Sequence, residues 1–355
     1  MKKSKGFAPF EDYSARLDEA IKQLFAEFTR QLPEVSEHAD WALEYVKTYS
    51  LQSGKRTRGS LAAAAYDHAK GTLFSQVGLR LGAAIEMIQN HLLIIDDVVD
   101  RSNLRRGQST LHRVYQRHYG SSEREADMAA ILIGMLPGQM AQFGLATIDE
   151  TPSQVAHALA ILARNLTITD VAQIDDMHHN AVKKPNLAAV LRKHEQKSSY
   201  YSFVNPLTMG LVLAGVEPKK ARHDAEQYGR PAGIAFQLQD DYLGLFGDTH
   251  ETGKPVFDDM REGKYTLMIH YAFEAATDEE RGAMEGILGD QAAGKTELER
   301  LQQIVRRTHA DTKARQIARD YAAQAKLAAQ KASSWSPKFG TILAELVDFS
   351  IERKA

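Results

Sequence analysis

The helical spacing of apolar residues along almost the whole chain is the feature that most constrains its fold. From Phe10 to Leu32, for example, apolar side chains recur three and four residues apart, which places them on one face of a helix. No segment shows a convincing run of the alternating pattern that a half-buried strand requires. Because helices bury such faces against one another, the sequence predicts an all-α fold.

The helical pattern continues along the chain without a sign of a domain boundary. A chain of 355 residues is long enough for two domains. No linker rich in Pro, Gly or Ser, no shift in composition and no repeat of fixed period divides it. We therefore expect a single all-α domain over residues 1–355, built as one large helical bundle.

Several helix starts carry capping boxes, in which a side chain at the helix start and one three residues later bind each other's backbone amides. The pairs are Ser122 with Glu125, Thr151 with Gln154, and Thr277 with Glu280. Pro137 lies inside the helix that starts at Ser122, and we expect a kink or a break there because proline has no amide hydrogen.

Three carboxylates end an apolar helical segment that runs from Leu79 to Ile95. Asp96 and Asp100 are four residues apart and share a helix face, and Asp97 is one step round it. Like charges this close repel one another, so a bound cation is a simple explanation. Magnesium binds carboxylate oxygens and bridges to substrate phosphates. The alternative is a solvated acidic helix end.

A second acidic pair, Asp240 and Asp241, follows another apolar helical pattern. Helical bundles build metal sites from side chains that project from different helices. We therefore expect the two acidic clusters to share one metal-binding mouth.

Three cations in four residues, Lys55, Arg56 and Arg58, lie between Gly54 and Gly59. Glycine lets the backbone approach a phosphate closely, so this turn is either an anion-binding cradle or a solvated basic loop.

The composition excludes several classes of function. The charge is nearly balanced, with 44 basic and 46 acidic residues, which gives no reason to expect nucleic acid or an anionic membrane as a partner. Cysteine is absent, so disulfides, thiolate metal sites and cysteine nucleophiles are excluded. The basic start lacks the apolar region of a secretory signal, and we expect no membrane span. The sequence predicts a soluble, cytoplasmic protein.

Taken in order, these motifs resemble those of the trans-prenyl diphosphate synthases, with farnesyl and geranylgeranyl diphosphate synthases as the most similar members. The matching segments run from Gly54 to Lys264: GKRxR, DDxxD followed by RRG, a lysine before a Tyr-rich turn, FQxxDDYLxxFGD, and two GK pairs. The resemblance implies a bundle around a central apolar cavity, of the isoprenoid synthase type. It also implies a short-chain prenyltransferase that joins isopentenyl diphosphate to an allylic diphosphate (dimethylallyl, geranyl or farnesyl).

The chemistry of such a reaction accounts for the residue types. Diphosphate leaves the allylic substrate, the carbocation joins the double bond of isopentenyl diphosphate, and a proton is then removed. The departure of diphosphate needs concentrated positive charge, and the carbocation needs a dry, apolar cavity.

The resemblance implies three magnesium ions. Asp96 and Asp100 resemble the family's ligands on the first motif, with Asp97 in support. Asp240 resembles the ligand of the third ion, with Asp241 acting through water.

The resemblance also assigns the substrate-binding residues. The allylic diphosphate would be held by Arg105, Lys197 and Lys254. Isopentenyl diphosphate would be held, without metal, by Lys55, Arg58, Gln89 and Arg106.

Other positions match the family's cavity and its closing loop. The helices lining the cavity would contribute Gln173, Asp176 and Gln237. Ser198 lies where threonine is common, and its hydroxyl offers a route for the proton, with diphosphate as the base. Lys264 would close over the site with its loop.

The sequence departs from the family pattern at Gly244, where the second acidic motif usually has a third aspartate. Only the first aspartate of that motif has to touch the ion, so we expect activity to survive. We also expect Gly244→Asp, which restores the usual pattern, to be tolerated.

Three other classes of protein share parts of this pattern. A class I terpene cyclase would lack the isopentenyl pocket of Lys55, Arg58 and Arg106. A non-catalytic subunit of a heteromeric prenyl synthase would commonly lose aspartates that this chain keeps. A di-iron bundle would need a repeated Glu-x-x-His pair, which is absent.

The family resemblance further implies a homodimer.

The length of the product depends on the residues just before the first acidic motif. His91 and Leu92 lie five and four positions before Asp96, on the helix along which the growing tail would run. In the family a large side chain at the first of these positions stops the tail. Leu92 leaves room for one more isoprene unit before His91, so geranylgeranyl diphosphate is favoured and farnesyl diphosphate is the alternative. Ile88 is the next candidate stopper.

Overall fold

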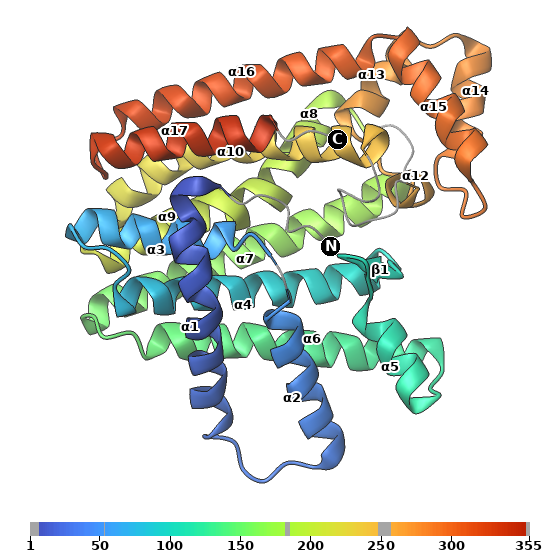
Figure 1. Ribbon diagram of the computed structural model, residues 1–355. Coiled ribbons are helices and arrows are strands. Elements are labelled where there is room, and N and C mark those ends of the chain that lie inside the picture. The colour runs from blue at the N-terminus through green and yellow to red at the C-terminus, as the bar shows by residue number, and fades with distance from the viewer. Residues whose placement is uncertain (1–6, 53, 182–184, 248–256, 353–355) are drawn as a thin grey trace. The chain divides into compact units, whose positions relative to one another are not determined.

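The computed structural model describes residues 7–52, 54–181, 185–247 and 257–352 (Figure 1). Within these ranges the regular structure is helical, apart from one pair of two-residue strands. The prediction of an all-α fold is confirmed.

The chain forms two compact units. The first unit contains Met1–Arg164, Asn205–Ala225 and Ala332–Gly340, and the second contains Asn165–Val204, Glu226–Lys331 and Thr341–Ala355. The single domain over residues 1–355 stays a prediction.

The elements of the first unit begin with a short 3-10 turn, η1 (Ala8–Phe10). In chain order they continue with α1 (Glu11–Thr29), α2 (Glu37–Ser50), α3 (Thr57–Lys70), α4 (Gln76–Val99), β1 (Leu104–Arg105), β2 (Gln108–Ser109), α5 (Leu111–Tyr119), α6 (Glu123–Ala146) and α9 (Asn205–Leu213). Three helices have residues in both units: α7 (Pro152–Ala181), α10 (Pro218–Phe246) and α17 (Pro337–Ile351).

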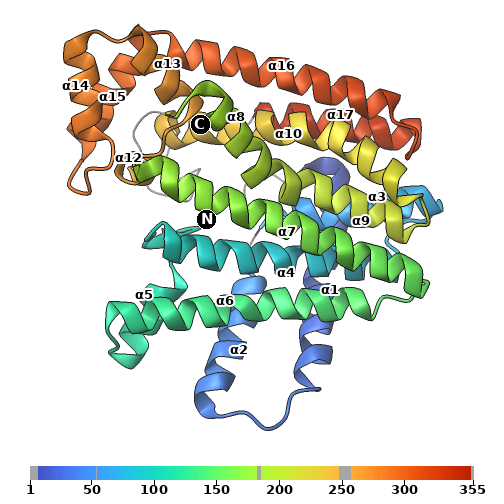
Figure 2. The same cartoon turned by 180° about the vertical axis from the view of Figure 1, so that it is seen from behind.

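Helix α4 is the central element of the first unit. It packs against α1, α3 and α6, and it lies beside α6 in both views (Figures 1 and 2). Two glycines let α3 and α4 touch through their backbones, because a Cβ on Gly59 would lie 2.6 Å from the carbonyl oxygen of Gly82. The acidic end of α4 is thus carried by a tightly packed helix.

The predicted helix starts agree with the structure. Ser122 and Thr277 each form a reciprocal capping box with the glutamate three residues later. Thr151 and Gln154 also exchange hydrogen bonds at the start of α7. Of the kink or break expected at Pro137, the break is wrong, since α6 continues through this buried proline, and the kink stays a prediction.

The strand pair is a short hairpin that the helical pattern did not predict. Leu104 pairs with Ser109 and Arg105 with Gln108. The two turn residues, Arg106 and Gly107, both have positive φ (53° and 75°), as tight hairpin turns require. Because arginine is uncommon at a position of positive φ, the residue types here do not predict this turn.

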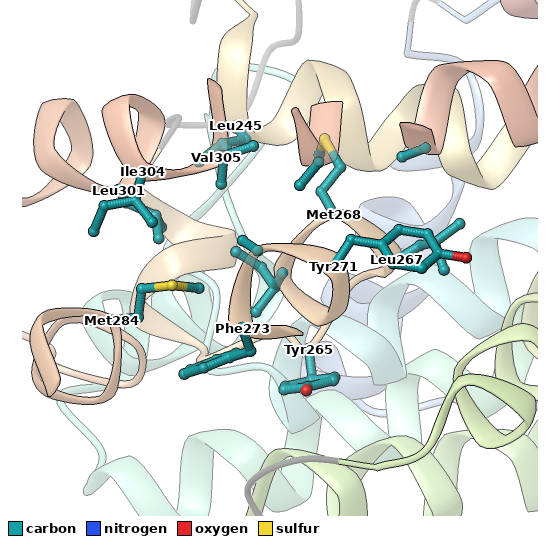
Figure 3. Close-up of a cluster of buried hydrophobic side chains, with 14 of the residues drawn as sticks. Leu245, Tyr265, Leu267, Met268, Tyr271, Phe273, Met284, Leu301, Ile304 and Val305 are labelled. Atoms are coloured by element: carbon teal, nitrogen blue, oxygen red, sulfur yellow. The ribbon is translucent and has the colours of Figure 1, made fainter. Parts of the chain in front are cut away.

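The second unit contains α8 (Leu187–His194), the π-helix η2 (Glu195–Val204), α12 (Asp258–Arg261), α13 (Leu267–Ala275), α14 (Asp278–Ile287), α15 (Lys295–Arg307) and α16 (Ala310–Lys331). Buried side chains from α10, α13, α14 and α15 meet in one hydrophobic cluster (Figure 3). Labelled members include Leu245, Met268, Met284 and Leu301.

The segment around Lys197 forms a ten-residue π-helix, η2. Gly233 of α10 packs directly against Ser199, and a Cβ on Gly229 would lie 3.0 Å from the amide nitrogen of Val204. These glycines leave room for the wider π turn. Such turns are rare and often occur at functional sites.

Two helical segments, Glu123–Ala146 and Pro152–Met177, are long and apolar enough to cross a membrane by length and composition alone. The most apolar 18-residue stretch is 50% buried in the first segment and 28% buried in the second. They are weak evidence for a membrane span.

Candidate active site

The first acidic motif lies on the last turn of α4. The helix continues through Asp96 and Asp97 to Val99, and Asp100 is its C-cap. The amide of Asp100 binds the carbonyl oxygen of Asp96 at 2.8 Å, and the amide of Ser102 binds that of Asp97 at 2.9 Å. The carboxylates are thus fixed to regular helical backbone, as their spacing predicted.

Arg105 joins two of these carboxylates. Its guanidinium lies 2.6 Å from Asp97 Oδ1 and 3.2 Å from Asp96 Oδ2. Burial disfavours the charged guanidinium, but the two carboxylates outweigh this effect and raise the pKa of Arg105. The residue predicted to hold diphosphate therefore lies against the predicted metal ligands, where its charge offsets theirs.

Arg106 and Tyr49 form a second buried polar group in the same unit. Nη1 of Arg106 and the Tyr49 hydroxyl are both buried and make no hydrogen bond within the part of the chain that the structure describes. Burial lowers the pKa of Arg106 and raises that of Tyr49 to about 12. A buried guanidinium nitrogen without an acceptor is suited to receive an anionic ligand.

The three cations of the basic turn before α3 differ in burial, since Arg56 points inward and the other two lie further out. Arg56 is buried, with a positive φ of 47°, and donates hydrogen bonds to Asp18 Oδ1 (3.0 Å) and to the carbonyl oxygen of Ser50 (2.7 Å). Lys55 and Arg58 are only partly buried. Arg56 is therefore a structural cation that shapes the turn, whereas the outer pair are the residues predicted to bind isopentenyl diphosphate.

Gln89 and the chain-length residues lie further back on α4. Gln89, His91 and Leu92 are all partly buried. His91 Nδ1 lies 2.8 Å from the carbonyl oxygen of Gly134 on α6, and a Cβ on Gly138 would be 3.2 Å from the imidazole. The imidazole is thus fixed between two glycines of the neighbouring helix.

In the second unit, Asp176 binds two lysines. Lys193 Nζ lies 2.8 Å from Asp176 Oδ1, and Lys197 Nζ lies 2.7 Å from Oδ2. Burial alone would raise the pKa of Asp176, but the two ammonium groups hold it well below its usual range. The structure therefore brings together two predicted site residues, Asp176 and Lys197, in one ion pair.

A short hydrogen-bonded chain links three more predicted residues. The Ser198 hydroxyl donates to Gln237 Oε1 at 2.5 Å, and Gln237 Nε2 donates to Asp241 Oδ1 at 2.8 Å. The π-helix supplies Ser198, and α10 supplies the other two. This arrangement fixes the side-chain amide of Gln237 between the hydroxyl and the carboxylate.

Asp241 is buried, whereas Asp240 is exposed. Burial raises the pKa of Asp241 to about 7, and the carboxylates of Asp259 and Asp240 also raise it. Asp241 Oδ2 makes no hydrogen bond to any residue that the structure describes, and the ring nitrogen Nε2 of His194 is 3.3 Å away. Burial lowers the pKa of His194 to about 3, so this imidazole is neutral.

Lys193 and His194 were missed by the sequence analysis. They follow the buried Val190 by three and four residues, so the helical spacing turns them to the same inward face. Charged or titratable residues on such a face are the signal that could have found them.

Lys264 and its neighbours complete the described part of this site. Lys264 Nζ lies 2.7 Å from Asp259 Oδ1 and 2.8 Å from Glu262 Oε2. Gln173 is partly buried on α7. The predicted residue Lys254 lies outside the described residues.

The donor chemistry suits a hard divalent cation. The acidic residues offer carboxylate oxygens, which are the ligands that magnesium prefers. One of them, Asp241 Oδ2, is buried and makes no hydrogen bond within the described ranges. Among the described residues, no three His, Cys, Asp or Glu side chains already converge as a preformed metal site. Any ion would therefore complete its coordination with water or phosphate oxygens, as magnesium commonly does.

The fold and these residues define a class of helical enzymes with aspartate motifs on α4 and α10. The chain belongs to the polyprenyl synthetase family, whose pattern it matches over residues 39–305. It is a prenyltransferase. The prediction of the family is confirmed.

A curated relative and two solved structures agree with this assignment. The geranylgeranyl diphosphate synthase of Sulfolobus acidocaldarius is 31% identical over 279 residues, which cover 77% of this chain and 79% of the relative. A polyprenyl synthase of Caulobacter crescentus, solved with calcium and isoprenyl diphosphate, is 27% identical with a TM-score of 0.77, covering 97% and 98% of the two chains. A geranylgeranyl pyrophosphate synthase of Corynebacterium glutamicum, 24% identical with a TM-score of 0.89 over 97% and 99% of the chains, shows the same fold.

Proposed function

We propose that the protein is a short-chain trans-prenyl diphosphate synthase that condenses isopentenyl diphosphate with allylic diphosphates and releases geranylgeranyl diphosphate. The observation that carries this proposal is the cluster of Asp96, Asp97 and Arg105 at the end of α4. It combines carboxylates for metal with a cation for diphosphate. The similarity to the geranylgeranyl diphosphate synthase named above supports the product.

Magnesium is the proposed metal. Asp96 and Asp100 would hold it at the first motif, with Asp97 in support, and Asp240 and Asp241 would hold it at the second. Three ions remain the expected number. Bound magnesium would neutralise the charge that develops on the leaving diphosphate.

Cationic side chains and one hydroxyl of the chain bind the substrates and transfer the proton. Arg105, Lys197 and Lys254 hold the allylic diphosphate, and Lys55, Arg58, Gln89 and Arg106 hold isopentenyl diphosphate. Ser198, fixed by its hydrogen bond to Gln237, offers its hydroxyl as a relay for the departing proton. Lys264 covers the diphosphate. Gln173 and Asp176 line the cavity.

The product length follows from His91. Because its imidazole is fixed against α6, it forms a stiff end to the space along α4. His91→Ala should therefore shift the products to chains longer than twenty carbons. Leu92→Phe, on the same helix one residue later, should shift them towards farnesyl diphosphate. An unchanged product spectrum in both variants would show that another residue limits the product length, with Ile88 as the next candidate.

We also infer a homodimer, with a second copy of this chain covering part of α6. Four large apolar side chains on this helix are exposed at helical spacing: Met128, Ile131, Leu132 and Met135. Leu132 is 65% exposed, so Leu132→Lys should leave the fold intact but give a monomer in light scattering. We place the enzyme in the cytoplasm.

Product analysis tests the proposed function directly. The purified protein is incubated with magnesium, isopentenyl diphosphate and each allylic primer in turn, and the products are sized. Geranylgeranyl diphosphate as the main product supports the proposal. Farnesyl diphosphate would correct the product, and no product from any primer would favour the non-catalytic subunit of a heteromeric synthase.

A further inference from the structure

Asp176 has two cationic partners that differ in exposure. Its side chain, on α7, is 7% exposed, and each carboxylate oxygen lies against a separate lysine. Lys193 Nζ is 2.8 Å from Oδ1 and its side chain is 8% exposed, whereas Lys197 Nζ is 2.7 Å from Oδ2 and its side chain is 25% exposed. The buried carboxylate therefore has one enclosed partner and one partner that is open to solvent.

We propose that Lys193 is a positioning residue, which keeps Asp176 paired when Lys197 turns to the diphosphate of the allylic substrate. The inference rests on the proposed function, because that function assigns Lys197 to the allylic diphosphate. Lys193 touches no substrate in this exchange and acts only through Asp176.

The backbone holds both lysines against the same carboxylate. Helix α8 continues directly into η2, so Lys193 and Lys197 are four residues apart and lie about one turn from each other. The start of α8 is fixed by Asn186, whose side chain accepts a hydrogen bond from the amide of Ala189 at 2.9 Å. Val190, three residues before Lys193, is 1% exposed and belongs to the hydrophobic cluster of the second unit. Lys193 is thus carried by a helix that is fixed at its start and along its buried face.

A carboxylate this deeply buried needs a counter-ion in every state of the enzyme. The two ammonium groups hold the pKa of Asp176 well below its usual range, so the carboxylate stays charged near neutral pH. Loss of the partner of a buried charge is strongly unfavourable, because it leaves that charge without compensation. If Lys197 were the only partner, each diphosphate that drew it away would bind more weakly by this penalty. Lys193 removes the penalty because it stays behind.

The difference in exposure indicates which lysine leaves. The side chain of Lys197 lies near solvent, so it can exchange one anionic partner for another without further burial. The side chain of Lys193 would have to leave an enclosed site to reach a substrate. An ammonium group has three N–H donors, so Lys193 can bind both oxygens of Asp176 once Lys197 has turned away.

Binding of an unreactive allylic substrate tests this exchange. Dimethylallyl thiolodiphosphate, in which sulfur replaces the ester oxygen, is titrated into the full-length protein with magnesium present, and calorimetry gives the dissociation constant. Lys193→Met keeps an apolar side chain of similar length but removes the charge. It should raise the dissociation constant about 10-fold or more, because Lys197 then leaves a buried carboxylate without a counter-ion.

A double-mutant cycle with Asp176→Asn shows whether Lys193 acts through Asp176. Without the carboxylate no charge is left behind, so adding Lys193→Met to Asp176→Asn should change the dissociation constant less than about 2-fold. An equal effect of Lys193→Met in both backgrounds would overturn the inference, because Lys193 would then bind the diphosphate itself or act through the fold. Wild-type binding by Lys193→Met would overturn it too.

Two further variants control for charge and for folding. Arg192, the preceding residue on α8, is exposed, so Arg192→Met removes the same charge from the same helix but leaves the partners of Asp176 in place. Its dissociation constant should stay within about 2-fold of the wild type, and a loss equal to that of Lys193→Met would overturn the inference. If thermal unfolding shows that Lys193→Met does not fold, Lys193→Gln takes its place. It keeps a neutral donor for Asp176 and should weaken binding about 3-fold or more, and wild-type binding by it would overturn the inference.

Kinetics separate the inference from the proposed function. Lys193→Met should raise the KM for the allylic substrate about 10-fold and leave that for isopentenyl diphosphate within about 2-fold, a split that lost stability alone would not produce. Lys197→Ala should weaken binding of the thiolodiphosphate in the same titration. If Lys197→Ala bound it as the wild type does, the role of Lys197 in the proposed function would fail, and the inference with it. If Lys197→Ala lost affinity and Lys193→Met did not, the inference alone would fail.

Discussion

At the scale of single residues, the aspartates of the two motifs carry the proposed metal chemistry. Asp96→Ala and Asp240→Ala should each lower turnover by about 100-fold or more, because diphosphate cannot leave readily without charge compensation. Steady-state kinetics at saturating magnesium would check this, with circular dichroism to show intact helices. Near wild-type turnover in either variant would remove that residue from the metal site.

Gly244 shows how a residue-scale prediction changes once neighbours are known. Gly244→Asp was expected to restore a family pattern, and its tolerance stays a prediction. In the structure, a side chain at position 244 would meet the carboxylate of Asp259. The Gly244→Asp variant therefore tests whether this contact can be relieved. The same substitution is better accommodated when Asp259 is removed.

Asp176 should make the stability of the protein depend on pH. Its pKa in the folded state lies below its usual value because Lys197 and Lys193 stabilise the carboxylate. The contribution of Asp176 to the free energy of unfolding is therefore fully present above its pKa in the unfolded chain, about 4. This contribution is lost as the pH falls through the pKa of Asp176 in the folded protein.

Urea unfolding of wild type and Asp176→Asn at several pH values measures this effect. Near pH 7 the variant should be less stable by about 3 kcal/mol, because two lysines lose a buried partner. The difference should shrink as the pH falls below about 4, because Asp176 of the unfolded chain then binds a proton that the folded carboxylate does not yet bind. A difference that stayed constant from pH 7 to acid would show that the ion pairs do not stabilise the fold.

At the scale of elements, the π-helix η2 depends on its close contact with α10. A Cβ on Gly233 would overlap Ser199, including its backbone Cα. Gly233→Ala should therefore destabilise the protein by about 1–3 kcal/mol. Gly282 of α14 is a matched control, since a Cβ there meets nothing within 4 Å.

Thermal and urea unfolding compare the two glycine variants. Gly282→Ala should be neutral or stabilise the protein by up to about 1 kcal/mol, because alanine favours helix. If both variants had the same stability, the contact between η2 and α10 would not constrain the π turn.

At the scale of the whole molecule, the two substrates should depend on residues of different units. Lys55 and Arg58 lie in the first unit and Lys197 in the second. Lys55→Ala and Arg58→Ala should raise the KM for isopentenyl diphosphate about 10-fold, with a smaller effect on the allylic substrate. Lys197→Ala should instead raise the KM for the allylic substrate and lower kcat.

Initial rates with each substrate varied in turn would separate these effects. Arg56→Ala serves as a contrast, because Arg56 is an inward structural cation whose loss should lower stability. If Lys55→Ala changed only the KM of the allylic substrate, the division between the two binding sites would be wrong.

Local patterns in the sequence are enough to predict the helices, their starts and the residue types of the candidate site. Helical spacing, capping boxes and clustered aspartates depend on residues a few positions apart, so they can be read without knowing the rest of the fold. The structure brings three of the predicted site residues together in the link from Ser198 through Gln237 to Asp241, and their roles stay predictions.

Only the tertiary structure decided which way individual side chains turn. Arg56 points inward and binds the carbonyl oxygen of Ser50. Arg105 lies against Asp96 and Asp97. The carboxylate of Asp259 lies in the space beside Gly244. The helix at Lys197 is widened into a π turn. These outcomes depend on contacts between segments distant in sequence, which balance burial, charge and close packing in ways that local spacing does not encode.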